Sequence, residues 1–206
     1  MKKIFNRHFL KGMLSIAIIV GFAGGCFAWD DELAGTTEIT LYYQQYRDFS
    51  FETGVVPFDF SPTRLSGGGL SVAQNIAEWF ALWTQLSVYG AVDQWTDFGG
   101  GVHAENKVRI LNNLQGVRYQ TRQYGPFRFY GKAGAGVSIY NFSIHGSGAS
   151  FSAAYGGGAN IWLNRNIGIT LDASHVLMSL PNVTDMDGRE RFDSGMTYTT
   201  GLTFRF

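Results

Sequence analysis

Apolar and polar residues alternate with a period of two through most of the chain after residue 37. Successive side chains of a β-strand point to opposite faces, so this pattern predicts strands with one apolar and one polar face. In the clearest segment Phe129 and Val137 face one way, while Arg128 and Lys132 face the other. The pattern predicts eight strands, at 38–48, 64–74, 80–93, 108–121, 127–142, 150–163, 167–176 and 196–206.

Two of these segments depart from the simple pattern. The segment 64–74 is rich in glycine and carries only Leu70 and Val72 on its apolar face. In the segment 108–121 the residues 110–114 do not alternate cleanly, for which we expect a β-bulge.

The connections between the predicted strands alternate in length. Long loops are expected at 52–63, 94–107, 143–149 and 177–194, and tight turns at 75–78, 122–126 and 164–166. Four loops at one end, with three turns and both termini at the other, are typical of a small barrel that spans an outer membrane. The fold class is therefore all-β, an eight-stranded antiparallel up-and-down transmembrane β-barrel. Its interior is just wide enough to be filled by side chains.

Glycine is abundant, with 27 residues, and much of it lies inside the predicted strands. Examples are the runs 67–69, 134–136 and 156–158. The flanking residues keep their alternation, which argues against flexible linkers. We expect these glycines to relieve crowding where strands bend around a narrow barrel.

The N-terminus has the layout of a secretory signal peptide. A basic stretch up to Lys11 precedes the apolar run 13–22 and the small-residue region 23–28. We predict a signal peptide at 1–28 and a barrel domain at 29–206, with cleavage after Ala28. As an alternative, Cys26 follows a weak lipoprotein box and would then be lipidated. Since Cys26 is the only cysteine, no disulfide forms within the chain.

The charge balance excludes an electrostatic attraction to nucleic acid, because 16 Lys and Arg residues match 16 Asp and Glu residues. Removal of the basic signal leaves the mature part mildly acidic. No apolar run after Phe22 is long enough for a membrane helix, so a membrane-embedded chain must span as strands.

Several charged residues fall on the predicted inner face of the barrel. Such charges either pair across the lumen and plug it, which we favour given the narrow interior, or line a small ion path. The predicted interior charge network is Glu38, Asp48, Asp93, Arg118, Arg128, Lys132, Asp172 and Arg205.

No catalytic site, cofactor or metal site is predicted. The segment Asp172-Ala-Ser-His175 holds the residue types of nucleophilic catalysis, but on a strand His175 faces away from Asp172 and Ser174. The histidines are scattered along the chain. We expect the acidic residues of the last loop, Asp185, Asp187, Glu190 and Asp193, to be solvated, although they could attract a divalent cation.

The last eleven residues put Tyr198, Leu202, Phe204 and Phe206 on one face. This segment resembles the C-terminal assembly signal of Gram-negative outer-membrane proteins. The segments 65–73, 116–119 and 130–136 resemble recurrent strands of the OmpA/OmpX-like outer-membrane β-barrel superfamily. The resemblance implies a barrel in the outer membrane of a Gram-negative bacterium, exported through the periplasm. It also implies contact with outer-membrane lipids, lipopolysaccharide and the barrel-assembly machinery. We expect the barrel alone, without a C-terminal peptidoglycan-binding domain.

The predicted function is structural and interactive: the barrel supports the envelope and displays four extracellular loops for adhesion or ligand contact. The loops hold the aromatic residues Phe58, Phe60, Trp95, Phe98 and Phe192, which serve either as contact anchors or as loop packing. Alternatives are a narrow porin-like channel and, less favoured, a lipid-modifying outer-membrane enzyme. Oligomeric state and natural ligand are not encoded in any motif of the sequence.

Overall fold

The computed structural model describes residues 33–47, 51–52, 59–60, 64–96, 103–142, 146–184 and 190–206. Eight long strands form one closed antiparallel barrel, in which each pairs with its neighbours in the chain and β1 pairs with both β10 and β4. This confirms the predicted fold class. The barrel strands are β1 (Thr37–Arg47), β4 (Arg64–Ala77), β5 (Phe80–Thr96), β6 (His103–Gln120), β7 (Phe127–Phe142), β8 (Gly146–Trp162), β9 (Ile167–Thr184) and β10 (Glu190–Arg205).

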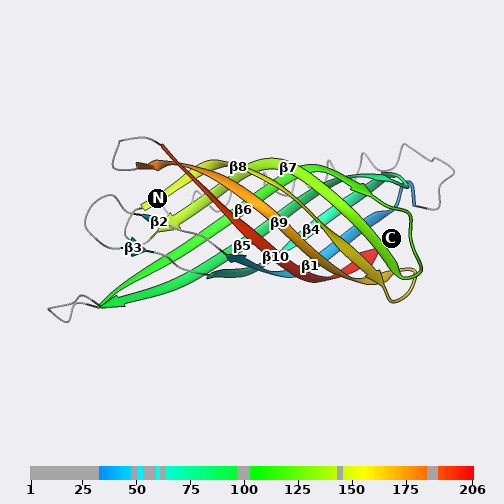
Figure 1. Ribbon diagram of the computed structural model, residues 1–206, viewed down its shortest axis with the longest axis horizontal. Helices are drawn as coiled ribbons and strands as arrows, with labels where there is room; N and C mark the ends of the chain where they lie inside the picture. The colour runs from blue at the N-terminus through cyan, green and yellow to red at the C-terminus, as the bar shows by residue number, and fades with distance from the viewer. Residues whose placement is uncertain are drawn as a thin grey trace, which may run out of the picture.

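The barrel closes where the first and last strands meet. The ladder between β1 and β10 runs from Glu38 opposite Arg205 to Arg47 opposite Met196. Backbone hydrogen bonds in both directions between Thr37 and Phe206 extend it. Closure leaves no sheet edge, which is the condition for a β-structure to span a lipid bilayer. Figure 1 shows the strands inclined to the long axis, with the C-terminus at the end where the short turns lie.

The two faces of the wall have the predicted character. Alternate residues of β1, such as Leu41 and Tyr43, are exposed on the outside, whereas Glu38, Thr40 and Gln44 are buried inside. The same alternation continues around the barrel, so the outer surface is apolar and the inner surface is largely polar. A β-barrel with this distribution spans a membrane. Among the described residues, no helix is long and apolar enough to cross a membrane.

The expected bulge in the fourth predicted strand is absent. The register of β6 runs without a shift against both β5 and β7. The alternation weakens there because Val108, Ile110 and Leu114 point into the barrel and are almost fully buried. At this level apolar side chains line the interior together with the buried Asn112, so inward and outward residues no longer differ clearly in polarity.

The strands extend well into three of the four predicted loops. Pairing between β5 and β6 continues to Thr96 opposite His103, and β7 pairs with β8 as far as Phe142 opposite Gly146. The β9–β10 ladder reaches Thr184 opposite Glu190, with a register shift next to Glu190. Figure 1 shows the β5–β6 hairpin projecting beyond the barrel. The predicted first loop holds a separate two-stranded sheet of β2 (Phe51–Glu52) and β3 (Asp59–Phe60). Backbone pairing outside the membrane requires no alternation, so the sequence pattern did not reveal these extensions.

The glycines inside the strands make room for aromatic side chains. A Cβ atom on Gly134 would lie 2.8 Å from Cζ2 of Trp83, and one on Gly158 would lie 2.7 Å from the hydroxyl of Tyr130. A Cβ atom on Gly69 would overlap the ring of Tyr42 in the same way. The predicted relief of crowding therefore has a specific form, in which an interior aromatic ring packs against a bare backbone.

We predict that Gly134→Ala lowers the free energy of unfolding by about 1–3 kcal/mol, because the added methyl group overlaps Trp83 and the backbone of Gln115. Gly131 is the matched control on the same strand, since the nearest atom to its added Cβ lies 3.8 Å away. Gly131→Ala should change stability by less than about 1 kcal/mol. Urea unfolding in lipid vesicles measures both, and equal effects would contradict the packing argument.

Candidate functional site

The main charged cluster lies inside the barrel near the turn end and centres on one carboxylate. Glu38 of β1 accepts from Arg118 of β6 at 2.5 Å, from Arg128 of β7 at 3.1 Å and from Arg205 of β10 at 3.1 Å. The side chains of Glu38 and Arg128 are fully buried, and those of Arg118 and Arg205 are nearly so. We call these four residues the arginine cluster.

Neutral groups complete the arginine cluster, because one carboxylate cannot satisfy three guanidinium groups. Arg118 donates to the side-chain oxygen of Gln120 at 2.9 Å, and Arg128 donates to that of Gln123 at 3.2 Å. The guanidinium of Arg205 also stacks on the ring of Trp162, 3.5 Å from its centroid. Such contacts stabilise buried cations, yet the cluster keeps an excess of two positive charges.

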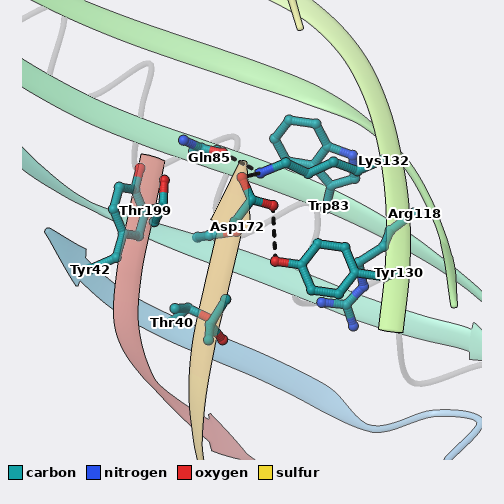
Figure 2. Close-up of a pocket in the computed structure, with 11 residues that line it drawn as sticks. Thr40, Tyr42, Trp83, Gln85, Arg118, Tyr130, Lys132, Asp172 and Thr199 are labelled. Atoms are coloured by element: carbon teal, nitrogen blue, oxygen red, sulfur yellow. Dashed lines mark hydrogen bonds and ion pairs between the residues drawn. The ribbon is translucent and has the colours of Figure 1, made fainter. Parts of the chain in front are cut away.

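A second, charge-balanced cluster lies deeper in the barrel (Figure 2). Lys132 pairs with Asp172 at 3.0 Å and donates to Gln85 at 3.3 Å. Asp172 also accepts from the hydroxyl of Tyr130 at 3.0 Å and from Ser174 at 2.7 Å. With three partners the carboxylate is well satisfied, as a buried charge requires.

The second cluster leaves little free space. A cavity of about 30 Å³ lies beside Lys132 and Asp172 and is also lined by Tyr42, Trp83 and Tyr130. This volume holds about two water molecules. An ion with its hydration shell does not fit without displacing the side chains.

The loop-side half of the interior is packed with buried tyrosine and aliphatic side chains, together with the buried polar residues Asn112, Ser138, Ser150 and Ser152. Tyr46 lies opposite Leu65 in the ladder, Ile110 lies opposite both Tyr89 and Tyr140, and all five are buried. The rings of Tyr46 and Tyr89 meet edge to face, 6.1 Å apart. We call this group the inner apolar cluster; it comprises Tyr46, Leu65, Tyr89, Val108, Ile110, Leu114, Tyr140, Ala154, Val176 and Met178.

The structure brings six of the eight predicted interior charges into these two clusters. The side chains of the other two, Asp48 and Asp93, lie outside the described residues. Sequence reasoning missed the neutral partners Gln85, Gln120, Gln123 and Tyr130, and also Asn160, whose side-chain amide donates to Glu38 at 3.4 Å. Inward-facing positions identify Gln85, Gln120, Asn160 and Tyr130 as candidates, whereas Gln123 lies in a turn, where no alternation identifies it.

The residue types of nucleophilic catalysis do not assemble. Ser174 donates to Asp172 inside the barrel, whereas the ring of His175 lies beside Tyr155 on the outer face, with 5.3 Å between ring centroids and 50° between the ring planes. The geometry required of a triad is therefore missing at this position. Within the described ranges, no three residues among His, Cys, Asp and Glu are grouped as metal ligands would be.

The predicted assembly-signal residues lie on the lipid-facing surface of β10 and at the chain's last residue. Tyr198, Leu202 and Phe206 are exposed, and Phe204 is half-buried. Their recognition by an assembly machinery stays a prediction. Cys26 and the rest of the predicted signal peptide lie outside the described residues.

Comparison with solved structures finds this fold among outer-membrane proteins. OprG from Pseudomonas aeruginosa superposes with a TM-score of 0.56 at 12% identity, over 84% of this chain and 96% of that one. Neisserial surface protein A gives 0.55 at 11% identity, over 84% of this chain and 98% of that one. Ail of Yersinia pestis gives 0.51 at 19% identity, over 83% of this chain and 98% of that one.

No family model and no curated protein matches the sequence. The resemblance to small OmpA/OmpX-like barrels is thus confirmed at the level of the fold. The chain has the fold of these small outer-membrane barrels.

We predict that Glu38→Gln lowers the free energy of unfolding by about 3–5 kcal/mol, because it leaves three buried guanidinium groups without a counter-charge. Glu78→Gln is the matched control, since among the described residues Glu78 forms one ion pair, with the exposed Arg122 at 3.6 Å. The control should cost about 0–1 kcal/mol. Urea titration in vesicles measures both, and a mild effect of Glu38→Gln would contradict the central role of this carboxylate.

Proposed function

We propose that the protein is a closed, non-conducting scaffold in the outer membrane, and that its working part is the outer end formed by the long hairpins. The observation that carries the proposal is the filled interior. Two ionic clusters occupy the turn-side half, and the inner apolar cluster occupies the loop-side half. The packed interior supports the wall, and contact with other molecules takes place at the two ends of the barrel.

The energetics of the interior disfavour the channel alternative. A permeating ion would have to break the pairs of Lys132 with Asp172 and of the arginine cluster, which lie in a poorly hydrated environment. Removing one partner from a buried pair costs several kcal/mol. The ion would then meet the inner apolar cluster, where the neighbouring polar side chains Asn112, Ser138, Ser150 and Ser152 replace only part of its hydration shell.

The sequence of the predicted outer loops favours a partner that is not strongly anionic. The four ranges contain eight acidic and three basic residues. Ail of Yersinia pestis has been crystallised with the heparin analogue sucrose octasulfate. Acidic loops repel such a polyanion. The similar fold therefore gives no reason to expect that this chain binds the same ligand. Of the five loop aromatics proposed as contact anchors, no side chain lies within the described residues.

We predict that the protein purified from outer membranes shows no single-channel steps in a planar bilayer. The variants Arg128→Ala and Lys132→Ala should have lower thermal stability. They should still show no single-channel conductance, because the inner apolar cluster stays in place. A wide porin inserted in the same bilayers serves as the positive control. Reproducible steps from folded wild-type protein would refute the closed barrel and favour the channel.

We also predict that phosphatidylcholine vesicles carrying the protein bind a soluble basic protein and do not bind heparin, as measured by co-sedimentation. The combined change Asp185→Asn, Asp187→Asn and Glu190→Gln should weaken the binding of the basic protein, because it removes three of the loop charges. Binding of heparin to vesicles that carry the wild type would contradict the inferred negative charge of the outer loops.

A further inference from the structure

Two amide side chains lie on the outer face of β6, where the neighbouring strands present apolar residues. Gln115 is exposed there and Asn113 is half-buried, whereas Asn112 and Leu114 are buried in the interior. The weak alternation at 110–114 therefore has an outward part as well as an inward one. We call Gln115 and Asn113 the outer amide pair.

The outer amide pair lies near the middle of the wall. The outward residues of β6 run from Tyr119, which is exposed at the turn end beside Trp79, to the exposed Arg109. This stretch of ten residues spans about 33 Å along the strand, or about 25 Å along the axis of a tilted strand, which equals the apolar band of such a barrel. Gln115 is four positions from Tyr119 and Asn113 is four positions from Arg109. Each amide is thus about 10 Å from the nearer boundary, too far for its side chain to reach water.

The chain itself does not satisfy the outer amide pair. No described residue forms a side-chain hydrogen bond with Gln115 or Asn113. Thr84 lies opposite Gln115 in the ladder, but its hydroxyl donates to a backbone carbonyl at 3.3 Å. By contrast Gln45, an amide on the outer face of β1, donates to the hydroxyl of Tyr43 at 3.3 Å. An unpaired amide is costly in lipid, so the partner of the outer amide pair comes from another molecule.

The wall beside the outer amide pair lacks large side chains. Ala135 lies opposite Gln115 in the ladder with β7, and Ala133 and Gly131 follow on the same exposed face. Gly157 of β8 lies opposite Gly131. Packing within the barrel does not require a glycine at position 131, because the nearest atom to an added Cβ lies 3.8 Å away. Small residues allow the backbone of a second membrane protein to approach closely.

We propose that the outer amide pair is the centre of a lateral interface at which a second copy of this chain binds in the membrane. An amide both donates and accepts, so two Gln115 side chains related by a two-fold axis satisfy each other. Copies inserted in one membrane share their orientation and depth. A second copy therefore always presents its amides at the same height, whereas an unrelated partner would need a matching polar group there.

This interface is local and adds a side contact to the end contacts of the proposed function, on whose membrane location it rests. The strands are inclined to the barrel axis (Figure 1). Facing strands of two barrels related by a two-fold axis along the membrane normal therefore cross, and contact concentrates at the crossing point. There the small residues of β7 permit close approach, and the amides fix the register of the two copies. Both ends of each barrel stay free.

The test is photo-cross-linking in the outer membrane of a Gram-negative host that produces the full chain. A benzoylphenylalanine replaces Val117, which is exposed on the same face two positions from Gln115. The test variant adds Gln115→Leu and Asn113→Leu. The matched control adds Gln45→Leu, which removes an amide from a distant part of the outer face. Membrane fractionation and gel mobility before and after heating show that each protein is inserted and folded.

We expect irradiation of the parent protein to give a product of twice the mass of the chain, with peptides from this chain alone. The test variant should lower its yield by about tenfold, the change that corresponds to loss of about one interhelical-strength hydrogen bond in lipid, and the control should not. The proposal is overturned if the test variant matches the parent, or if the product holds a different protein or only lipid.

The same experiment separates this proposal from the proposed function. A folded barrel in the outer membrane that gives no dimer overturns the interface alone. A chain that fractionates away from the outer membrane overturns both, because no part of its wall then faces lipid.

Discussion

The structure depends on one carboxylate placed among three guanidinium groups. Glu38 lies on β1, and Arg128 lies on β7, which is on the opposite side of the closed barrel. Arg118 and Arg205 approach the same carboxylate from two further strands. A barrel of eight strands is narrow enough for side chains to meet across it. Four parts of the wall are thus tied together through the interior, in addition to the ladder that joins each strand to its neighbours.

The interior is divided along the axis, and this division limits what the protein can do. Charges paired with carboxylates and amides occupy the turn-side half, while buried tyrosines and aliphatic residues, together with Asn112 and several serines, occupy the loop-side half. An ionic path would need water along its whole length, whereas an apolar ligand would need space in the loop-side half. On the proposed function, the filled interior provides neither, and interaction with other molecules concentrates at the two ends. The predicted outer loops are acidic, whereas Arg122, Arg165 and Arg205 line the turn end.

The glycine content follows from the same narrow interior. Tyr42, Trp83 and Tyr130 each lie against a glycine of another strand, where any larger residue would overlap the ring. The sequence indicated that glycines within strands relieve crowding, since their neighbours kept the alternation. It could not pair Gly134 with Trp83, because these residues are 51 positions apart and meet only through the register of β5, β6 and β7. Register is a property of the assembled sheet.

The sequence by itself determined the class of protein and the face on which most residues lie, because the two-residue period of a strand is a local property of the backbone. It placed Arg118, Lys132 and Asp172 inside the barrel on this basis. Only the tertiary structure decided which charges meet, since Glu38 and Arg205 are 167 positions apart and become neighbours through closure. It also decided that the weak alternation in β6 comes from the inward-pointing Val108, Ile110 and Leu114, because a break in the pattern does not show which face those residues occupy. How far the hairpins extend was likewise decided only there, since pairing outside the membrane requires no alternation.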